Sequence, residues 1–234
     1  MEWTSNKDTW PNSELSKFAK VKPHLWHFQD SGNIDDPIVL LLHGAGASTH
    51  SWRSLISFLK KYFRVIAVDL PGHGFTTLGS HHRSSLNDMS EDISHLLNQQ
   101  KLKPKYIVGH SAGAALALRY AIDADCPPKG IISINGALDG FNGLANFFFP
   151  LIAKLLTITP LLTPMITRLT KEQKNVDKLL LSTGSNLDSE GSSFYKRLLS
   201  DDKHIDGILT MMAQWDLKNL GEDIRNLEIP VCFL

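Results

Sequence analysis

One serine of the chain stands in the stretch GHSAG, residues 109–113, which fits the pattern G-x-S-x-G. The apolar run 106–110 leads into it, and an alanine-rich segment with helical spacing follows. A serine at such a junction lies on a strained turn between a buried strand and a helix, where small neighbours let the two elements approach. Ser111 is therefore the predicted nucleophile, with its hydroxyl above the carboxyl edge of a sheet.

Two backbone amides are predicted to stabilise an oxyanion beside this serine. The Ala112 amide begins the helix, where N–H groups and the positive end of the dipole point at the same spot. The glycine-rich stretch HGAG, residues 43–46, follows an apolar strand, and its Ala45 amide is the second expected donor. His43, which opens this stretch, is expected to hold the loop by hydrogen bonds rather than to act as the base.

Alternating strand and helix patterns must position these groups. Short apolar runs typical of buried strands alternate with segments of helical spacing. This alternation predicts an α/β fold with an open, doubly wound, mostly parallel sheet. The expected strands are 38–42, 64–70, 106–110 and 130–136, and the expected helices are 48–60, 84–99 and the segment after Ser111.

The chain changes character after residue 140, because no strand-like run appears for about ninety residues, which is too long for an ordinary connection. We expect a core over residues 1–139, a helical lid inserted over 140–215, and a return to the core over 216–234 that ends in a short strand. The apolar part of the insertion contains three prolines and a lysine, which favours lid helices over a membrane span.

Composition excludes some classes of function. Lys+Arg and Asp+Glu both number 24, so the chain lacks the basic surface that nucleic-acid binding needs. Cys126 and Cys232 show no metal-ligand spacing and are expected to be reduced thiols. No metal and no cofactor are predicted. The N-terminus lacks an apolar secretory segment, so a cytoplasmic location is the default expectation.

The motifs together resemble a known superfamily. The HGAG loop, the stretch DLPGHG, the GHSAG elbow and the helical insertion are similar to the α/β-hydrolase superfamily over roughly residues 20–234. The stretch MMAQWDLKNL, residues 211–220, narrows the resemblance to the BchO family of magnesium chelatase accessory proteins in bacteriochlorophyll biosynthesis. Two departures are the HGAG stretch, where HGTG is expected, and a length shorter than that of family members.

The resemblance has consequences for the catalytic acid and base. In this fold the order along the chain is Ser, acid, His. The resemblance implies that both the acid and the histidine follow residue 234, so that the chain is part of a longer protein and is catalytically silent by itself. Asp139 occupies an alternative acid position used by some members. Asp69 is expected to order its loop, and the sequence around His204 does not favour it as the base.

Several functions are compatible with the resemblance. One is a serine hydrolase that acts on an ester, amide or similar acyl group. Another is an accessory module that binds a tetrapyrrole and associates with magnesium chelatase without hydrolysis. A cofactor-free oxygenase or haloperoxidase and a general esterase unrelated to pigments are further alternatives. The resemblance favours a role in bacteriochlorophyll biosynthesis under either of the first two.

The lid supplies the apolar surface that a small-molecule substrate such as a tetrapyrrole would contact. Phe148, Met211 and Trp215 are the predicted substrate-binding residues, since aromatic and flexible apolar side chains line such pockets. Most other apolar side chains of the lid are expected to pack it onto the core. A lid of this composition is also compatible with peripheral contact with a membrane surface.

Overall fold

A seven-stranded sheet forms the centre of the part of the chain that the structure describes. The computed structural model describes residues 1–138, 162–170, 172–182, 184–185 and 187–234. The strands are β1 Ser16–Val21, β2 His24–Ser31, β3 Ile38–Leu42, β4 Arg64–Val68, β5 Pro104–His110, β6 Gly130–Ile134 and β7 Val231–Phe233.

The strand order is β1-β2-β4-β3-β5-β6-β7, and five of these strands run parallel. The parallel part confirms the predicted α/β class. The antiparallel pair β1 and β2 at one edge was not predicted from the sequence. The second strand of this pair buries the polar residues His24, His27 and Gln29. The strand therefore lacks the alternation of buried apolar and exposed polar residues by which a half-buried strand is recognised in a sequence.

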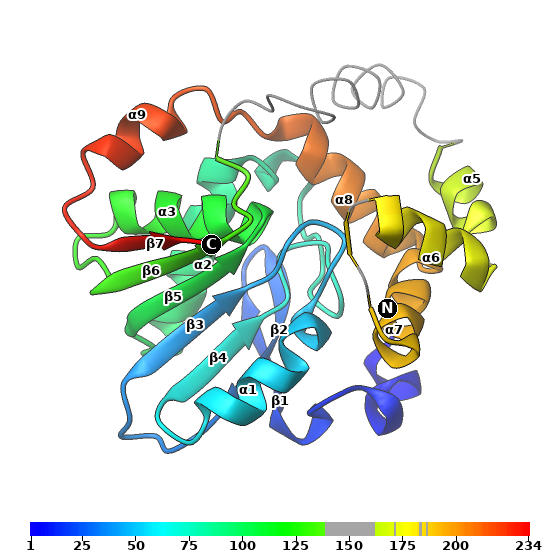
Figure 1. Ribbon diagram of the computed structural model, residues 1–234, viewed down its shortest axis with the longest axis horizontal. Helices are drawn as coiled ribbons and strands as arrows, with labels where there is room; N and C mark the ends of the chain where they lie inside the picture. Colours follow the sequence, from blue (N-terminus) through cyan, green and yellow to red (C-terminus); the bar gives the residue numbers. More distant parts are fainter. Residues whose placement is uncertain (139–161, 171, 183, 186) are drawn as a thin grey trace.

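Helices cover both faces of the sheet (Figure 1). The strands alternate their side chains: Leu40 and Leu42 pack in one core with α2 Leu86–Gln99, α3 Ala112–Asp123 and α9 Leu220–Arg225. Val39 and Leu41 pack in the opposite core with α1 Arg53–Leu59. These faces correspond to the doubly wound arrangement expected from the continuous apolar strands.

The helices expected after Ser111 and over 84–99 are present as α3, which begins at Ala112, and as α2, which begins two residues later than expected and ends at Gln99. Ser85 caps α2, because its side chain accepts a hydrogen bond from the Asp88 amide. The helix expected over 48–60 is shorter. A 3-10 turn occupies Thr49–Trp52 before α1 begins, because the Thr49 amide is bonded to the Asp69 carboxylate instead of continuing a helical pattern. Four more 3-10 turns lie at Trp3–Ser5, Lys7–Thr9, Ser13–Leu15 and His81–Arg83.

The described part of the predicted lid is helical. It contains α5 Leu162–Leu169, α6 Gln173–Ser182, α7 Ser189–Leu199 and α8 Asp202–Gln214. Figure 1 shows α6, α7 and α8 grouped beside the carboxyl ends of the parallel strands. None of the helices in the described ranges is long and apolar enough to cross a membrane. The domain boundaries at 140 and 215 stay predictions.

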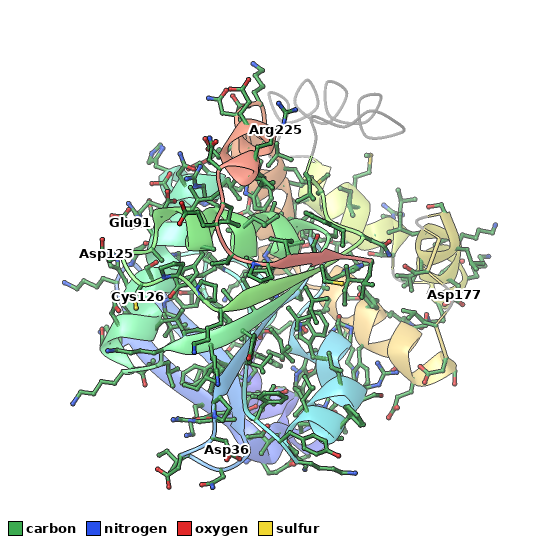
Figure 2. The ribbon with its side chains drawn as sticks, turned by 60° about the vertical axis from the view of Figure 1, so that its left-hand side comes forward. Asp36, Glu91, Asp125, Cys126, Asp177 and Arg225 are labelled. Atoms are coloured by element: carbon green, nitrogen blue, oxygen red, sulfur yellow. The ribbon has the colours of Figure 1, made fainter. Side chains whose placement is uncertain are left out.

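Both cysteines are free thiols on the surface, which agrees with the expectation that they are not paired. Figure 2 shows Cys126 at the periphery of the molecule, next to Asp125 in the connection after α3. Cys232 lies on β7, the edge strand of the described sheet.

Candidate active site

Ser111 occupies a strained turn between β5 and α3. Its φ of 52° and ψ of −115° lie in a region that L-residues rarely adopt. Backbone bonds hold this conformation: the Ser111 amide donates to the Ile134 carbonyl at 2.9 Å, and the Ser111 carbonyl accepts from the Ala114 and Ala137 amides at 3.0 and 3.2 Å. The turn therefore has the strand–turn–helix geometry of a nucleophile elbow.

The two glycines of the motif make this turn sterically possible. A Cβ at residue 109 would overlap the backbone of Gly113 and Ala114, and a Cβ at residue 113 would overlap the carbonyl group of Leu42. This confirms the expectation that small residues are needed where strand and helix approach. It also shows that α3 packs directly on the end of β3, from which the loop 43–46 departs.

The loop 43–46 lies against the elbow. A Cβ built on Gly44 would be 3.2 Å from the Ser111 Cβ. The loop is a tight turn in which the Ala47 amide donates to the Gly44 carbonyl at 3.1 Å and Gly46 has a φ of 75°. Ala45 is exposed, and within the described residues no acceptor is recorded for its amide. Ala112 is the first residue of α3, so its amide has no intrahelical acceptor either.

His43 holds this loop in the way the sequence predicted. It is fully buried, its Nε2 accepts a hydrogen bond from the Leu70 amide at 3.0 Å, and its Nδ1 donates to the Gly44 carbonyl at 2.8 Å. Burial lowers the pKa of His43. Because both ring nitrogens are hydrogen-bonded to backbone groups, the His43 ring is neutral and links the two loops. These contacts agree with the expectation that His43 is not the catalytic base.

Asp69 orders the loop that follows β4, also as expected. Its buried carboxylate accepts hydrogen bonds from the Thr49 amide at 2.7 Å, from the Phe75 amide at 2.9 Å and from His27 Nδ1 at 2.7 Å. Burial by itself would raise the pKa of Asp69, but the charge and hydrogen bond of His27 and the amide bonds outweigh it and hold the pKa below its usual range.

Sequence reasoning did not foresee a buried histidine cluster beside these loops. The His73 ring is tilted against the His43 ring, with ring centroids 5.4 Å apart, and the His204 ring of α8 meets the His73 ring edge-on at 5.2 Å. Burial lowers the pKa of His73 to about 3 and lowers that of His204 well below its usual value. A signal existed in the helical spacing, because residues 204, 207 and 211 share the buried face of α8.

The predicted alternative acid and the predicted substrate-binding residues differ in where they lie. Asp139 and Phe148 lie outside the described residues. Met211 is buried in the main core, and Trp215 is half-buried against the same core. Contact of these two side chains with a ligand therefore stays a prediction. Among the described residues, no hydrogen bond between the Ser111 hydroxyl and a histidine is recorded, and no cluster of His, Cys, Asp or Glu is arranged to hold a metal ion.

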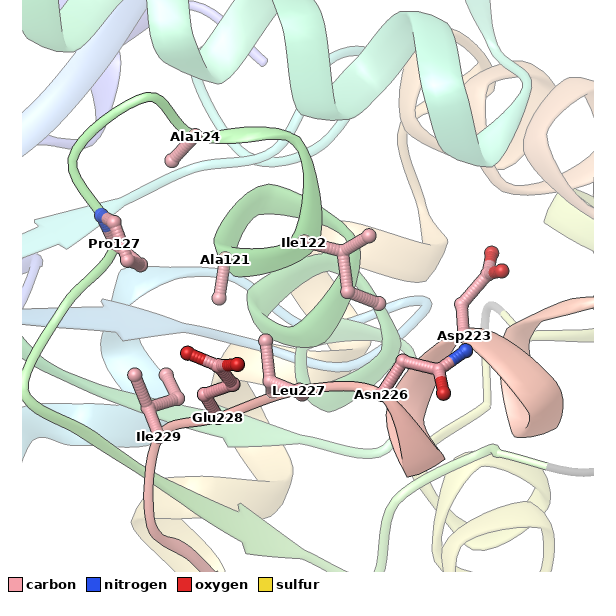
Figure 3. Close-up of a pocket in the computed structure, with 9 residues that line it drawn as sticks. All are labelled: Ala121, Ile122, Ala124, Pro127, Asp223, Asn226, Leu227, Glu228 and Ile229. Atoms are coloured by element: carbon pink, nitrogen blue, oxygen red, sulfur yellow. The ribbon is translucent and has the colours of Figure 1, made fainter.

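A hollow of about 290 Å³ lies elsewhere on the molecule, between the end of α3 and the segment 223–229 (Figure 3). Ala121 and Ile122 form one wall, and Leu227 and Ile229 form the other. Ala121 is ten residues beyond Ser111, which corresponds to about 15 Å along the helix axis. This hollow is therefore at the opposite end of α3 from the elbow.

The fold and the elbow define the class of this protein. The chain belongs to the α/β hydrolase fold family, whose model matches residues 37–234. Its sequence is similar to that of the magnesium-chelatase 30 kDa subunit of Rhodobacter capsulatus, with 39% identity over 222 residues that cover 95% of this chain and 78% of the relative. The human monoacylglycerol lipase ABHD6 is 40% identical over 92 residues, which cover 36% of this chain and 26% of that protein.

Solved structures agree on the fold. The crystal structure of Cfl2 from Burkholderia cenocepacia matches with a TM-score of 0.74 at 20% identity, covering 93% of this chain and 78% of that one. An α/β hydrolase fold protein from Burkholderia ambifaria matches with a TM-score of 0.73 at 19% identity, covering 94% and 79%. At these identities the likeness shows the fold alone. The resemblance stated from the motifs is thus confirmed.

Proposed function

We propose that this protein is a serine hydrolase that serves as an accessory factor at the magnesium-chelatase stage of bacteriochlorophyll biosynthesis. The observation that carries the hydrolase part is the strained backbone of Ser111, which the structure holds between the loop 43–46 and the start of α3. Strain of this kind persists where the surroundings over-determine it, and it is frequent at active sites.

In the proposed reaction, the Ser111 hydroxyl adds to the carbonyl carbon of an acyl group. The carbonyl oxygen takes up the electron pair and is stabilised by the Ala45 and Ala112 amides, an effect for which each donor contributes about 10²–10³ in rate. The serine proton passes to a histidine. His43 and His204 cannot be that base, because both nitrogens of each ring are bonded to backbone groups.

The identity of the acid and base stays a prediction. The chain order Ser, acid, His places the acid after Ser111 and the histidine after the acid. Asp139 is the alternative acid, and no residue is assigned here as the base. When the tetrahedral intermediate collapses, the bond to the leaving group breaks and the histidine gives its proton to that group, which leaves an acyl-enzyme on Ser111. A water molecule, deprotonated by the histidine, then attacks the acyl-enzyme and releases the carboxylic acid and the free Ser111 hydroxyl.

The biosynthetic part of the proposal rests on the relative from Rhodobacter capsulatus, which bears the name of a magnesium-chelatase subunit and aligns over nearly the whole chain. Association with magnesium chelatase and action on a tetrapyrrole or its acyl ester follow from that similarity as proposals. The elbow belongs to a fold with many activities, so the fold does not by itself select the substrate.

Labelling with a fluorophosphonate probe tests the hydrolase. The full-length protein should be labelled at Ser111, Ser111→Ala should lose the label, and Ser57→Ala should keep it, because Ser57 is an exposed serine of α1. A folded protein that carries no label at Ser111 would contradict the proposal.

A second candidate function is porphyrin binding without turnover. The same relative is named as a subunit of magnesium chelatase and not as a hydrolase, which supports this candidate. A titration with protoporphyrin, followed by its absorbance and by tryptophan fluorescence, separates the two. Saturable binding by an unlabelled protein would favour the binding module. Ready hydrolysis of p-nitrophenyl esters without porphyrin binding would favour a general esterase.

A further inference from the structure

Two buried histidines bind the carbonyl groups on either side of Ala45. His43 Nδ1 lies 2.8 Å from the Gly44 carbonyl oxygen, and His204 Nε2 lies 3.2 Å from the Gly46 carbonyl oxygen. The first histidine directly follows β3, whereas the second belongs to α8, 158 residues away from Gly46 in the chain. The proposed oxyanion donor is thus bracketed by one local and one distant contact.

The backbone partners define the tautomer of each ring. The Leu70 amide donates to His43 Nε2 at 3.0 Å, so Nδ1 carries the proton that reaches Gly44. The Gly74 amide donates to His204 Nδ1 at 3.1 Å, so Nε2 carries the proton that reaches Gly46. Both rings are neutral, with opposite tautomers, and each links the loop 43–46 to the loop 70–74.

These contacts determine how the Ala45 amide points. The Gly44 carbonyl and the Ala45 N–H belong to one planar peptide group, in which they point in opposite directions. The bond from His43 therefore orients the peptide that carries the donor. The bond from His204 holds the Gly46 carbonyl, in the next peptide but one, and so fixes the far end of the same tight turn.

The position of His204 is determined by the close packing of α8 against the loop 70–74. A Cβ at Gly207 would overlap the backbone of Gly72, and one at Gly72 would lie 2.8 Å from the Gly207 Cα. The helix therefore crosses the loop 70–74 in backbone contact, which brings residue 204, one turn earlier on the same face, to Gly74 and Gly46. His204 itself is only 1% exposed.

We propose that His204 is a positioning residue for the oxyanion loop, and that the site is competent only while α8 is docked on the loop 70–74. This inference rests on the proposed function, since it takes the Ala45 amide as an oxyanion donor. It assigns to the lid helix a part in the geometry of the acyl-transfer site, beyond covering a ligand. Oxyanion donors act through preorganisation, so a turn that is loose by a fraction of an ångström loses rate.

Three substitutions separate the two hydrogen bonds of the ring. His204→Phe keeps a ring and loses both bonds. His204→Asn places an amide oxygen near the position of Nδ1, which keeps the Gly74 bond and loses the Gly46 bond. His204→Gln reaches far enough to make both. His95→Phe is the matched control, because His95 is an exposed histidine of α2.

The measurements are the rate of fluorophosphonate labelling at Ser111 and hydrogen exchange of the segment 43–50 in the full-length protein. We expect His204→Phe and His204→Asn to slow labelling roughly tenfold, less than the 10²–10³ lost with a donor itself, and to speed exchange of the Ala47 amide. His204→Gln and His95→Phe should stay within about threefold of the unmodified protein. If His204→Phe does not fold, the pair His204→Asn and His204→Gln decides.

The outcomes distinguish this inference from the proposed function. Unchanged labelling and exchange in folded His204→Asn, beside a labelled unmodified protein, overturns the positioning role alone. An unmodified protein that is never labelled overturns the proposed function and, with it, the oxyanion role. Equal slowing in His204→Asn and His204→Gln also contradicts the inference, because it would show that the Gly46 bond is not what matters.

Discussion

The elbow at 109–113 and the loops bridged by histidines lie side by side, yet they are built in different ways. The elbow needs five consecutive residues and backbone bonds to Ile134 and Ala137. The bridged loops 43–46 and 70–74 depend on the side chains of His27 in β2, His43 after β3 and His204 in α8, which are far apart in sequence. One half of the site is thus a local motif, while the other half exists only in the folded molecule.

Lowering the pH should have the largest effect on the free energy of unfolding, and most of it should come from the histidines at and near the bridged loops. Burial lowers the pKa of His50 and His73 to about 3, so both are neutral in the fold, whereas the unfolded chain protonates them below about pH 6.5. Stability is then complete above about pH 6.5 and falls as the pH drops toward 3, by roughly 2 kcal/mol for each histidine at pH 5. The groups that face them are His43, His204 and Asp69, with Arg53 near His50.

Urea unfolding at pH 7.5, 6 and 5 measures this dependence. Burial also lowers the pKa of His110 in the elbow, so that residue adds to the same loss. His73 of the loop 70–74 and His50 of the turn Thr49–Trp52 should carry the larger part, since their pKa values fall to about 3. An unfolding free energy that is constant between pH 7.5 and pH 5 would show that the histidines are not held neutral.

The substitution Gly113→Ala tests the elbow at 109–113, which is the local half of the site. The added Cβ would overlap the Leu42 carbonyl, which is backbone and cannot move aside cheaply, so we expect a loss of about 3 kcal/mol or more. Gly130→Ala is the control, because a Cβ there would lie 3.5 Å from the nearest atom, in ordinary contact. Thermal unfolding of both variants provides the comparison, and equal melting temperatures would mean that α3 does not need this approach to β3.

The substitution Asp69→Asn tests the bridged loops, which are the non-local half of the site. The amide keeps the shape of the carboxylate but turns one acceptor into a donor that faces a backbone N–H, and it removes the charge beside His27. We expect a loss of about 2 kcal/mol in unfolding free energy. Asp125→Asn should change nothing, since that side chain is exposed (Figure 2). Denaturant midpoints of the two variants check the difference.

The smallest expected effect on stability is the difference between two variants of Ser111, and here glycine should be the more stable one. Glycine adopts a φ of 52° without penalty, so it should be more stable than Ser111→Ala by about 1 kcal/mol, although both variants lack the hydroxyl. A melting temperature for Ser111→Gly at or below that of Ser111→Ala would mean that the elbow stores no backbone strain.

Much of this molecule could be predicted from local sequence. The run 38–42 is β3 without a change of boundary, because a strand buried on both faces is continuously apolar. The elbow was predicted by spacing, since only small residues fit at 109 and 113. His43 and Asp69 were expected to order their loops from their positions at strand ends, and their hydrogen bonds confirm it.

Only the tertiary structure decided the rest. The pair β1 and β2 escaped prediction because buried His24, His27 and Gln29 find partners far away in the chain, and their burial is therefore invisible in a local pattern. The helical spacing of residues 204, 207 and 211 marks His204 as buried, but nothing in the sequence identifies the loops that it binds. Its partners at Gly46 and Gly74 are brought to it by the packing of α8, and a hydrogen bond between groups more than a hundred residues apart depends on the whole fold rather than on any stretch of sequence.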